Sequence, residues 1–256
     1  MQKMPVVFVG HGSPMNVVSD NDFTRSLVDL GRELARPKAI MVISAHWLTS
    51  GTFVTCDRTP KTIHDFYGFP EELYLKQYPA PGSPEVADRV IQIVKKPGIS
   101  CGDWGLDHAS WLILKHMYPK ADVPTFEMSL DYTKSAQYHY DWASQLAPLR
   151  EEGILIIGSG NLVHNIRAAQ PDIDAEPYDW AVEFDEIVKE NLINRYHQNL
   201  IDYPKYGRLS SLAIPTNDHY LPMIYAIALQ EQNEPITFVY EGFQHSAASM
   251  RCFKIG

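Results

Sequence analysis

The chain has 256 residues, with 22 Lys and Arg against 31 Asp and Glu, so its formal charge at pH 7 is −9. Hydrophobic residues make up 45% of it and charged residues 21%, a balance typical of a folded globular chain and not of a disordered one. The acidic excess disfavours nucleic acid as a partner, because binding to a phosphate backbone needs clustered Lys and Arg.

The expected compartment follows from the cysteines and the apolar runs. Cys56, Cys101 and Cys252 are odd in number and widely spaced, which fits neither a disulfide framework nor a metal site, so we expect three reduced thiols. The apolar run near the N-terminus is too short for a signal peptide, and no uninterrupted run approaches the roughly 20 residues of a membrane span. We therefore expect a cytoplasmic, soluble protein with no membrane partner.

In chain order, short apolar runs alternate with amphipathic segments. A buried strand is predicted at 6–9, a helix over Phe23–Leu34 that closes before Pro37, and a second strand at 39–44. Residues 57–82, rich in Pro, Gly and aromatic residues, form a long ordered loop of the kind that makes lids or pocket walls. A helix begins at Ser83 and Pro84, a third strand spans 153–158, a helix surrounds Trp180–Val188, and a fourth buried strand spans 236–240.

This alternation predicts an α/β fold: a mostly parallel central sheet covered by helices on both faces. No repeat, low-complexity tract or convincing boundary divides the chain, so we expect one domain over residues 1–256. In such sheets the ligand site lies outside the carboxyl ends of the strands.

Four of the ten histidines fall where that site is expected. His11 follows the first strand, His46 ends the second, and His164 follows the strand at 153–158. His219 lies just before an apolar helix. A single histidine of this kind is more often a hydrogen-bonding residue, but neutral imidazole is the commonest nitrogen ligand of Zn, Fe and Cu. Their common placement favours a mononuclear metal site and an enzyme whose chemistry the spacing leaves open.

The other histidines carry weaker signals. His108 begins a helix, where it could face a substrate or serve with Asp107 in capping. His64 lies in the aromatic loop and could line a pocket or hold the loop together through Asp65. His245 could face the site from the last hairpin, whereas we expect His116, His139 and His197 to be structural or solvated.

Motifs of other enzyme classes are absent from the sequence. The G-x-S-x-G nucleophile elbow, the G-x-G-x-x-G dinucleotide loop and the Walker loop do not occur. The paired acidic residues at 71–72 and 151–152 are typical of solvated turns and give no basis for glycosidase chemistry.

Eight short strings, in order along nearly the whole chain, resemble the class III extradiol ring-cleaving dioxygenases, specifically their bacterial branch of the 4,5-DOPA dioxygenase type. The strings are Gly10-His11-Gly12-Ser13-Pro14-Met15-Asn16, Ser44-Ala45-His46-Trp47, Thr62-Ile63-His64-Asp65-Phe66, Tyr78-Pro79-Ala80-Pro81-Gly82-Ser83-Pro84, Asp107-His108, Ser159-Gly160-Asn161, Val163-His164-Asn165 and His219-Tyr220-Leu221-Pro222.

The resemblance implies one divalent metal ion held by His11, His46 and His219, with His164 as either a fourth ligand or the acid/base residue beside it. His108 would contact substrate or oxygen. The wider superfamily usually supplies two His and a Glu, the facial triad of Fe(II) oxygenases. Here the third position is His219, and four imidazoles would also suit tetrahedral Zn(II). We expect Fe(II) in the active protein and Zn(II) in a purified sample.

The implied reaction uses O₂ to open the ring of a catechol such as L-DOPA, giving a muconate semialdehyde. His164 would accept and return a proton, and His108 would stabilise charge that develops on oxygen. His64, Phe66 and Tyr67 would form the substrate pocket, Phe66 or Tyr67 stacking on the ring.

Two points stay open. A DOPA carboxylate needs a cationic partner, for which Arg58 and Arg251 are the candidates. The same histidines would also serve a zinc hydrolase, or a zinc protein that binds without turnover.

Overall fold

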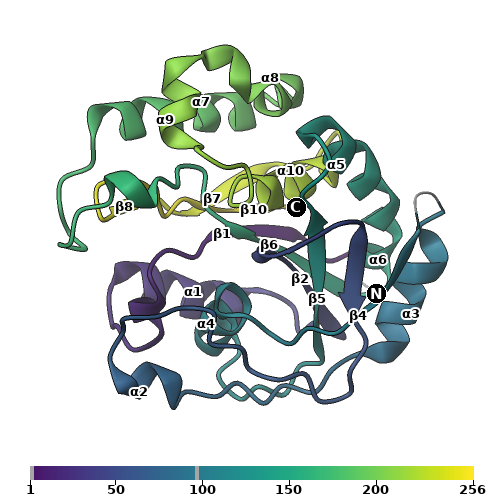
Figure 1. Cartoon of the computed structure of the whole chain (residues 1–256). Coiled ribbons are helices and arrows are strands. Elements are labelled where there is room, and N and C mark those ends of the chain that lie inside the picture. The colour runs from purple at the N-terminus through teal and green to yellow at the C-terminus, as the bar shows by residue number, and fades with distance from the viewer. Residues whose placement is uncertain (1–2, 96–97) are drawn as a thin grey trace.

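An eight-stranded sheet forms the centre of the computed structural model, which describes residues 3–95 and 98–256 (Figure 1). The strand order is β4-β3-β5-β2-β6-β1-β10-β7, and β8 and β9 form a separate two-stranded sheet. The strands are β1 Val6–Gly10, β2 Ala39–Thr49, β3 Thr52–Thr55, β4 Ile99–Gly102, β5 Thr125–Asp131, β6 Ile154–Gly160, β7 Ile236–Tyr240, β8 Phe243–Gln244, β9 Ala248–Ser249 and β10 Cys252–Ile255.

The middle of the sheet is parallel, as predicted. β1 pairs with β6, β6 with β2 and β2 with β5, all in parallel, so these four strands end at one edge. The sheet turns antiparallel at β3 against β5 and at β10 against both β1 and β7. The prediction of a buried strand at 236–240 is wrong in its burial, because β7 is an antiparallel edge strand with no fully buried residue.

Helices cover both faces of the sheet. α1 and α4 pack on one face, and α3 and α5–α10 lie on the other (Figure 1). The helices are α1 Asp22–Glu33, α2 Glu71–Tyr74, α3 Pro84–Ile93, α4 His108–Met117, α5 Ala136–Ala143, α6 Ala147–Glu151, α7 Asp179–Ile193, α8 His197–Ile201, α9 Arg208–Ala213 and α10 Leu221–Ala228, with 3-10 turns η1 Pro14–Val17, η2 Ser144–Leu146, η3 Ile166–Ala168 and η4 Tyr203–Tyr206. Each helix in this described part of the chain is too short or too polar to cross a membrane.

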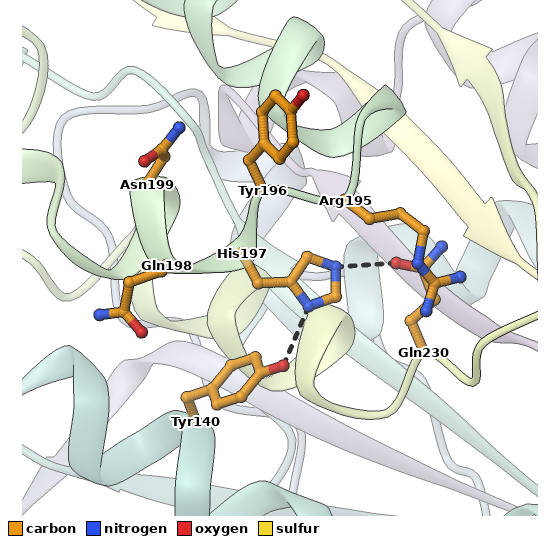
Figure 2. A pocket seen from close by; sticks show the side chains of 7 residues that line it. All are labelled: Tyr140, Arg195, Tyr196, His197, Gln198, Asn199 and Gln230. Carbon is orange, nitrogen blue, oxygen red and sulfur yellow. Dashed lines mark hydrogen bonds between the residues drawn. The ribbon is translucent and has the colours of Figure 1, made fainter.

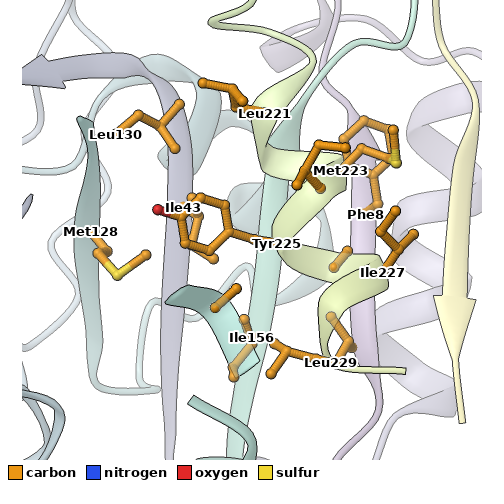
Figure 3. Packing of buried hydrophobic residues seen from close by; sticks show 14 of the residues in the cluster. Phe8, Ile43, Met128, Leu130, Ile156, Leu221, Met223, Tyr225, Ile227 and Leu229 are labelled. Atoms are coloured by element: carbon orange, nitrogen blue, oxygen red, sulfur yellow. The ribbon is translucent and has the colours of Figure 1, made fainter. Parts of the chain in front are cut away.

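Strand alternation divides the core into two layers. In β1, Val6 and Phe8 join the layer under α10, whereas Val7 and Val9 join the layer under α1 and α4. Figure 3 shows the first layer, where Met223 and Ile227 of α10 lie near Phe8. Because both faces are covered, the central strands are continuous apolar runs, which is the pattern that the sequence shows.

The turn before α10 lies against the end of β6 because two glycines leave room for it. A Cβ on Gly158 would come within 2.4 Å of the Pro222 carbonyl oxygen, and one on Gly160 within 2.1 Å of the His219 carbonyl oxygen. The Asn161 amide donates to the same His219 carbonyl at 2.8 Å. The close approach therefore places His219 at the carboxyl edge of the sheet.

The expectation of three reduced cysteines is wrong. Cys56 and Cys101 form a disulfide, with their Cα atoms 5.6 Å apart, and only Cys252 of the described residues is free and buried. The cause is the parallel pairing of β3 with β4, in which Thr55 lies opposite Gly102 and Cys56 follows directly. The two cysteines are 45 residues apart, and their spacing in the sequence does not reveal that strand pairing brings them together.

A buried histidine on α5 makes stability depend on pH. His139 is fully buried, accepts from the Tyr225 hydroxyl at Nδ1 (2.9 Å) and donates from Nε2 to the Asp131 carbonyl (3.2 Å). Burial lowers the pKa of His139 to about 4. The folded protein therefore favours the neutral ring, and as the pH falls His139 takes up a proton at a higher pH in the unfolded chain than in the folded one.

We expect the titration of His139 to lower the free energy of unfolding by about 3 kcal/mol as the pH falls from about 6.5 to about 4, because the pKa of this residue is lower in the folded state. Urea unfolding across this range should give a shallower pH dependence for His139→Gln than for the natural chain. Equal slopes for the two proteins would contradict the assignment.

Candidate metal centre

The four histidines predicted at the carboxyl edge of the sheet do come together there. His11 follows β1, His164 lies in the loop after β6 and His219 in the turn before α10. His46 is inside β2, not at its end, since β2 continues to Thr49. The pairing of β2 with β5 is irregular between Ile43 and Leu48, and this irregularity includes His46.

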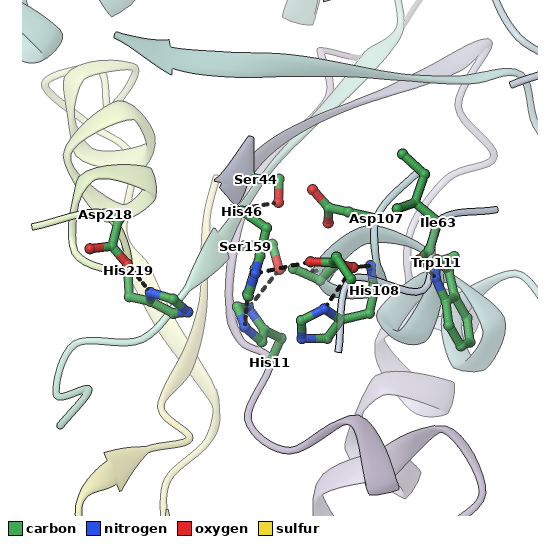
Figure 4. A network of polar contacts seen from close by, with 12 residues as sticks. His11, Ser44, His46, Ile63, Asp107, His108, Trp111, Ser159, Asp218 and His219 are labelled. Carbon is green, nitrogen blue, oxygen red and sulfur yellow. Dashed lines mark hydrogen bonds and ion pairs between the residues drawn. The ribbon is translucent and has the colours of Figure 1, made fainter. Parts of the chain in front are cut away.

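Three of these side chains converge on one point. Nitrogen atoms of His11, His46 and His219 all lie within 4.8 Å of one another. The Nε2 atoms of His11 and His46 are 3.3 Å apart, and Nε2 of His219 is buried without a hydrogen-bond partner (Figure 4). His11 and His219 are only 2% and 6% exposed, so bulk water cannot supply hydrogen bonds to their nitrogen atoms.

The opposite nitrogen of each ring is already engaged. His11 Nδ1 donates to the Ser159 hydroxyl at 3.1 Å, because that hydroxyl donates its own hydrogen to the Ala109 carbonyl. His46 Nδ1 pairs with Asp65 Oδ2 at 3.0 Å, and His219 Nδ1 pairs with Asp218. With Nδ1–H as the donor, each neutral ring keeps a lone pair on Nε2.

This donor set fits a metal ion. Facing lone pairs repel unless a cation lies between them, and imidazoles hydrogen-bonded through the far nitrogen are the usual form of histidine ligands. Two nitrogens each about 2.1 Å from an ion at a tetrahedral angle lie about 3.4 Å apart, close to the His11–His46 separation. Among the described residues, this cluster could therefore hold one divalent metal ion.

Burial favours the neutral form of two of the three converging rings, and the carboxylates act on the third. Burial, followed by the neighbouring imidazoles, lowers the pKa of His11 and of His219 well below the ordinary value. Burial is the largest influence on His46 and acts against its protonation, but the contact with Asp65 and the negative charges of Asp107, Asp65 and Asp218 together outweigh it and raise the pKa of this residue. Despite its burial, Asp65 has a lowered pKa because His108 and His46 stabilise its carboxylate.

Asp65 is the residue of this site that the sequence prediction missed. Its Oδ1 accepts from both the backbone N–H and Nδ1 of His108, each at 3.0 Å, while Oδ2 faces His46. The long loop thus supplies the carboxylate that binds the first N–H of α4, and the Asp107 side chain makes no capping hydrogen bond. The signal available was the carboxylate inside the Thr62–Phe66 string.

His64, expected in the pocket, is placed elsewhere. Its Nε2 donates to the Lys76 carbonyl at 2.9 Å, and its ring lies against Phe66, Tyr74 and Trp111. It is absent from the residues that line the cavity described below. His64 holds the aromatic loop in shape through this carbonyl, and not through Asp65.

His164 and His108 flank the cluster. The His164 ring stacks on that of His219, with centroids 3.5 Å apart and planes 9° apart, and burial lowers the pKa of His164 to about 4. The His108 ring lies 4.2 Å from that of His46, and burial lowers its pKa as well. Both residues are therefore neutral near pH 7.

A cavity of about 610 Å³ opens over the cluster, within the size range of ligand pockets. All five histidines of the cluster and its flanks line it, as do the apolar side chains of Phe66, Phe69 and Pro14. Its exposed lining residues, which we call the cavity mouth, are Tyr67, Ile166, Ala169, Gln170 and Pro171. Phe66 and Tyr67 thus both reach the cavity, Phe66 buried and Tyr67 at the mouth.

Neither arginine candidate for a substrate carboxylate is in this cavity. Arg251 is buried against Asp185 and Glu241, and Arg58 pairs with Glu85 at 3.0 Å. Their expected role in binding a carboxylate is wrong, because both guanidinium groups are already paired elsewhere.

A second hollow, near α8, is less suited to a ligand (Figure 2). Its central His197 accepts from the Tyr140 hydroxyl at 3.0 Å and donates to Gln230 at 2.9 Å. Both ring nitrogens are therefore used within the protein. The cavity over the histidine cluster is the better candidate site.

We expect His46→Ala to lose bound metal and Asp65→Asn to weaken metal binding about 10- to 100-fold, because Asp65 orients the ligand ring. Metal content after dialysis against a graded chelator measures both effects. His197→Gln, in the second hollow, is the control and should bind as the natural chain does. Full metal retention by His46→Ala would contradict the site.

Comparison with known proteins agrees with this geometry. Residues 5–250 match the family described as the catalytic LigB subunit of aromatic ring-opening dioxygenase. The chain is 46% identical to the 4,5-DOPA dioxygenase extradiol of Escherichia coli (strain K12), over 99% of this chain and 95% of that protein. It is 34% identical to the protein of the same description from Beta vulgaris, over 96% of this chain and 94% of that one.

A solved structure shows the same architecture. The crystal structure of an uncharacterized protein from Escherichia coli K12 superposes with a TM-score of 0.87 and 41% identity, over 99% of this chain and 100% of that chain. The resemblance drawn from the eight strings is confirmed: the chain belongs to the LigB family of class III extradiol ring-opening dioxygenases.

Proposed function

We propose that this protein opens the ring of a catechol, L-DOPA or a close relative, with O₂, using one divalent metal ion held by His11, His46 and His219. The observation that carries the proposal is the convergence of their Nε2 lone pairs at the inner end of a cavity flanked by two neutral imidazoles. The names of the relatives support the choice of substrate.

When bound by these three histidines, Fe(II) would supply the redox chemistry with O₂ that Zn(II) lacks. Three neutral ligands leave its charge uncompensated, which favours a catecholate. Both oxygen atoms of O₂ end in the product, a muconate semialdehyde, so no further reductant is needed.

His164 is our candidate for the acid/base residue. It is outside the group of three histidines whose nitrogens converge, and its stacking on His219 keeps it beside that group. Because burial lowers its pKa to about 4, it is neutral near pH 7 and can accept the proton of a substrate hydroxyl. It can then return that proton to the opened product.

His108 can act in two steps. Its Nδ1–H donates to Asp65, so the neutral ring offers Nε2 as an acceptor and not as a donor. Once Nε2 takes the proton of the second substrate hydroxyl, the Asp65 carboxylate compensates the imidazolium. His108 can then donate a hydrogen bond to charge that develops on oxygen, the role expected from the sequence.

The catechol ring would pack against Phe66. This side chain lines the cavity, is 6% exposed and meets His108 edge-on, with ring centroids 5.6 Å apart. It is fixed by contacts with Phe69 and Tyr74 on the same loop. A rigid apolar wall beside polar groups is the usual construction of a site for an aromatic ligand.

Protein loaded with Fe(II) under anaerobic conditions and then given L-DOPA and air should consume O₂ and form a yellow semialdehyde in equal amounts. Protein loaded with Zn(II) is the matched control and should bind the catechol without O₂ uptake. Bound Fe(II) with no O₂ uptake from any catechol would contradict the proposal and leave a zinc-dependent hydrolase to be tested.

We expect His164→Ala to retain metal and to lose at least about 100-fold in turnover, since a positioned acid/base residue contributes about that much. Metal analysis and O₂ uptake on the same sample separate its possible roles. Loss of metal would make His164 a ligand, and unchanged turnover would exclude it from the chemistry.

A further inference from the structure

The cavity over the histidine cluster has no cationic side chain. Of the described residues that line it, none is Lys or Arg, and the only carboxylate, Asp65, is committed to His46 and His108. A substrate carboxylate inside this cavity would therefore have no counter-ion of the protein. Arg167 is adjacent to Ile166 along the chain, but it is exposed and does not line the cavity.

The cavity mouth presents apolar surface instead. Tyr67 is 89% exposed and Ile166 is 73% exposed, two of the most exposed large hydrophobic side chains in the described chain. They come from different segments, the aromatic loop and η3, and both line the same cavity. A substituent that leaves the catechol ring toward solvent would lie against these two side chains.

His245 also lines the cavity, and its free ring nitrogen is a hydrogen-bond acceptor. Its Nδ1 donates to the Gln170 carbonyl at 2.8 Å, which leaves the lone pair of the neutral ring on Nε2. Its backbone is left-handed, with φ 53°, and is fixed by hydrogen bonds with Ile173 and Gln170. In the tautomer that donates through Nδ1, Nε2 of His245 is an acceptor and suits a hydroxyl or ammonium group.

We propose that this cavity selects catechols whose ring substituent carries no net negative charge, the substituent packing between Tyr67 and Ile166. The inference rests on the proposed function and narrows its substrate class. Neutral, cationic and zwitterionic substituents satisfy it, whereas a lone carboxylate on a short arm does not. The cost to the carboxylate is desolvation in a mouth whose described lining residues offer no Lys or Arg as a counter-ion.

Three catechols with arms of similar size test this selection: 3,4-dihydroxyphenylacetate, 4-(2-hydroxyethyl)catechol and dopamine, which carry an anionic, a neutral and a cationic arm. Anaerobic titration calorimetry on the zinc-loaded protein measures affinity without turnover, and kcat/KM on the Fe(II) enzyme measures selection in the reaction. We expect the neutral and cationic compounds to exceed the anionic one at least about ten-fold in both measurements.

Two variants at the mouth supply the gain of function and its control. Ile166→Arg places a cation there and should bring the anionic compound to within about three-fold of the neutral one. Ile166→Gln changes size and polarity without charge and should keep the original preference. Neither substitution touches the histidine cluster.

The outcomes are separable. An anionic compound that equals or exceeds the neutral one in the natural chain overturns the charge selection, while the proposed ring opening stands. A loss of anionic binding in Arg167→Ala also overturns it, because Arg167 would then act as the missing cation. Failure of all three catechols and of L-DOPA to bind or react overturns the proposed function itself.

Discussion

The contact between Nδ1 of each converging histidine and an oxygen atom of a neighbouring side chain is the interaction on which the site depends. Ser159, Asp65 and Asp218 fix three rings in the one tautomer that leaves Nε2 free. Without these partners the rings could rotate or turn their protons inward, and the lone pairs would not meet. Gathering unpaired acceptors in a buried space is unfavourable, and the free energy of folding offsets this. A cation can therefore bind a site that is already arranged.

The fold delivers these partners from parts of the chain that are far apart. Ser159 is on β6 beneath the cluster, whereas Asp65 comes from the long loop after β3. That loop is tied to the segment before α4 by the Cys56–Cys101 disulfide at one end and by the Thr62–Leu106 bridge further along. Both ties precede the Asp65–His108 contact along the two segments and hold these segments side by side, so the covalent link supports a polar contact in the site and not only the sheet edge.

The sequence predicts the elements whose chemistry is local. Continuous apolar runs identified β1, β2 and β6, and the histidines after them could be assigned to one edge because parallel strands share it. It did not predict the Asp65–His108 contact, the disulfide or the exposed position of β7, since each depends on how segments pair across the sheet. His46 shows the same limit: its place inside β2 depends on an irregular register that no run of residues reveals.

The inner end and the mouth of the cavity obey different physical rules. At the inner end, paired charges and fixed protons make a place where an ion and a catecholate compensate one another. At the mouth, Tyr67 and Ile166 offer contact area without charge, so what enters is sorted by the cost of losing water. Chemistry and selection are therefore built from different segments, and the mouth can change its preference while Asp65, Ser159 and Asp218 keep the three rings in place.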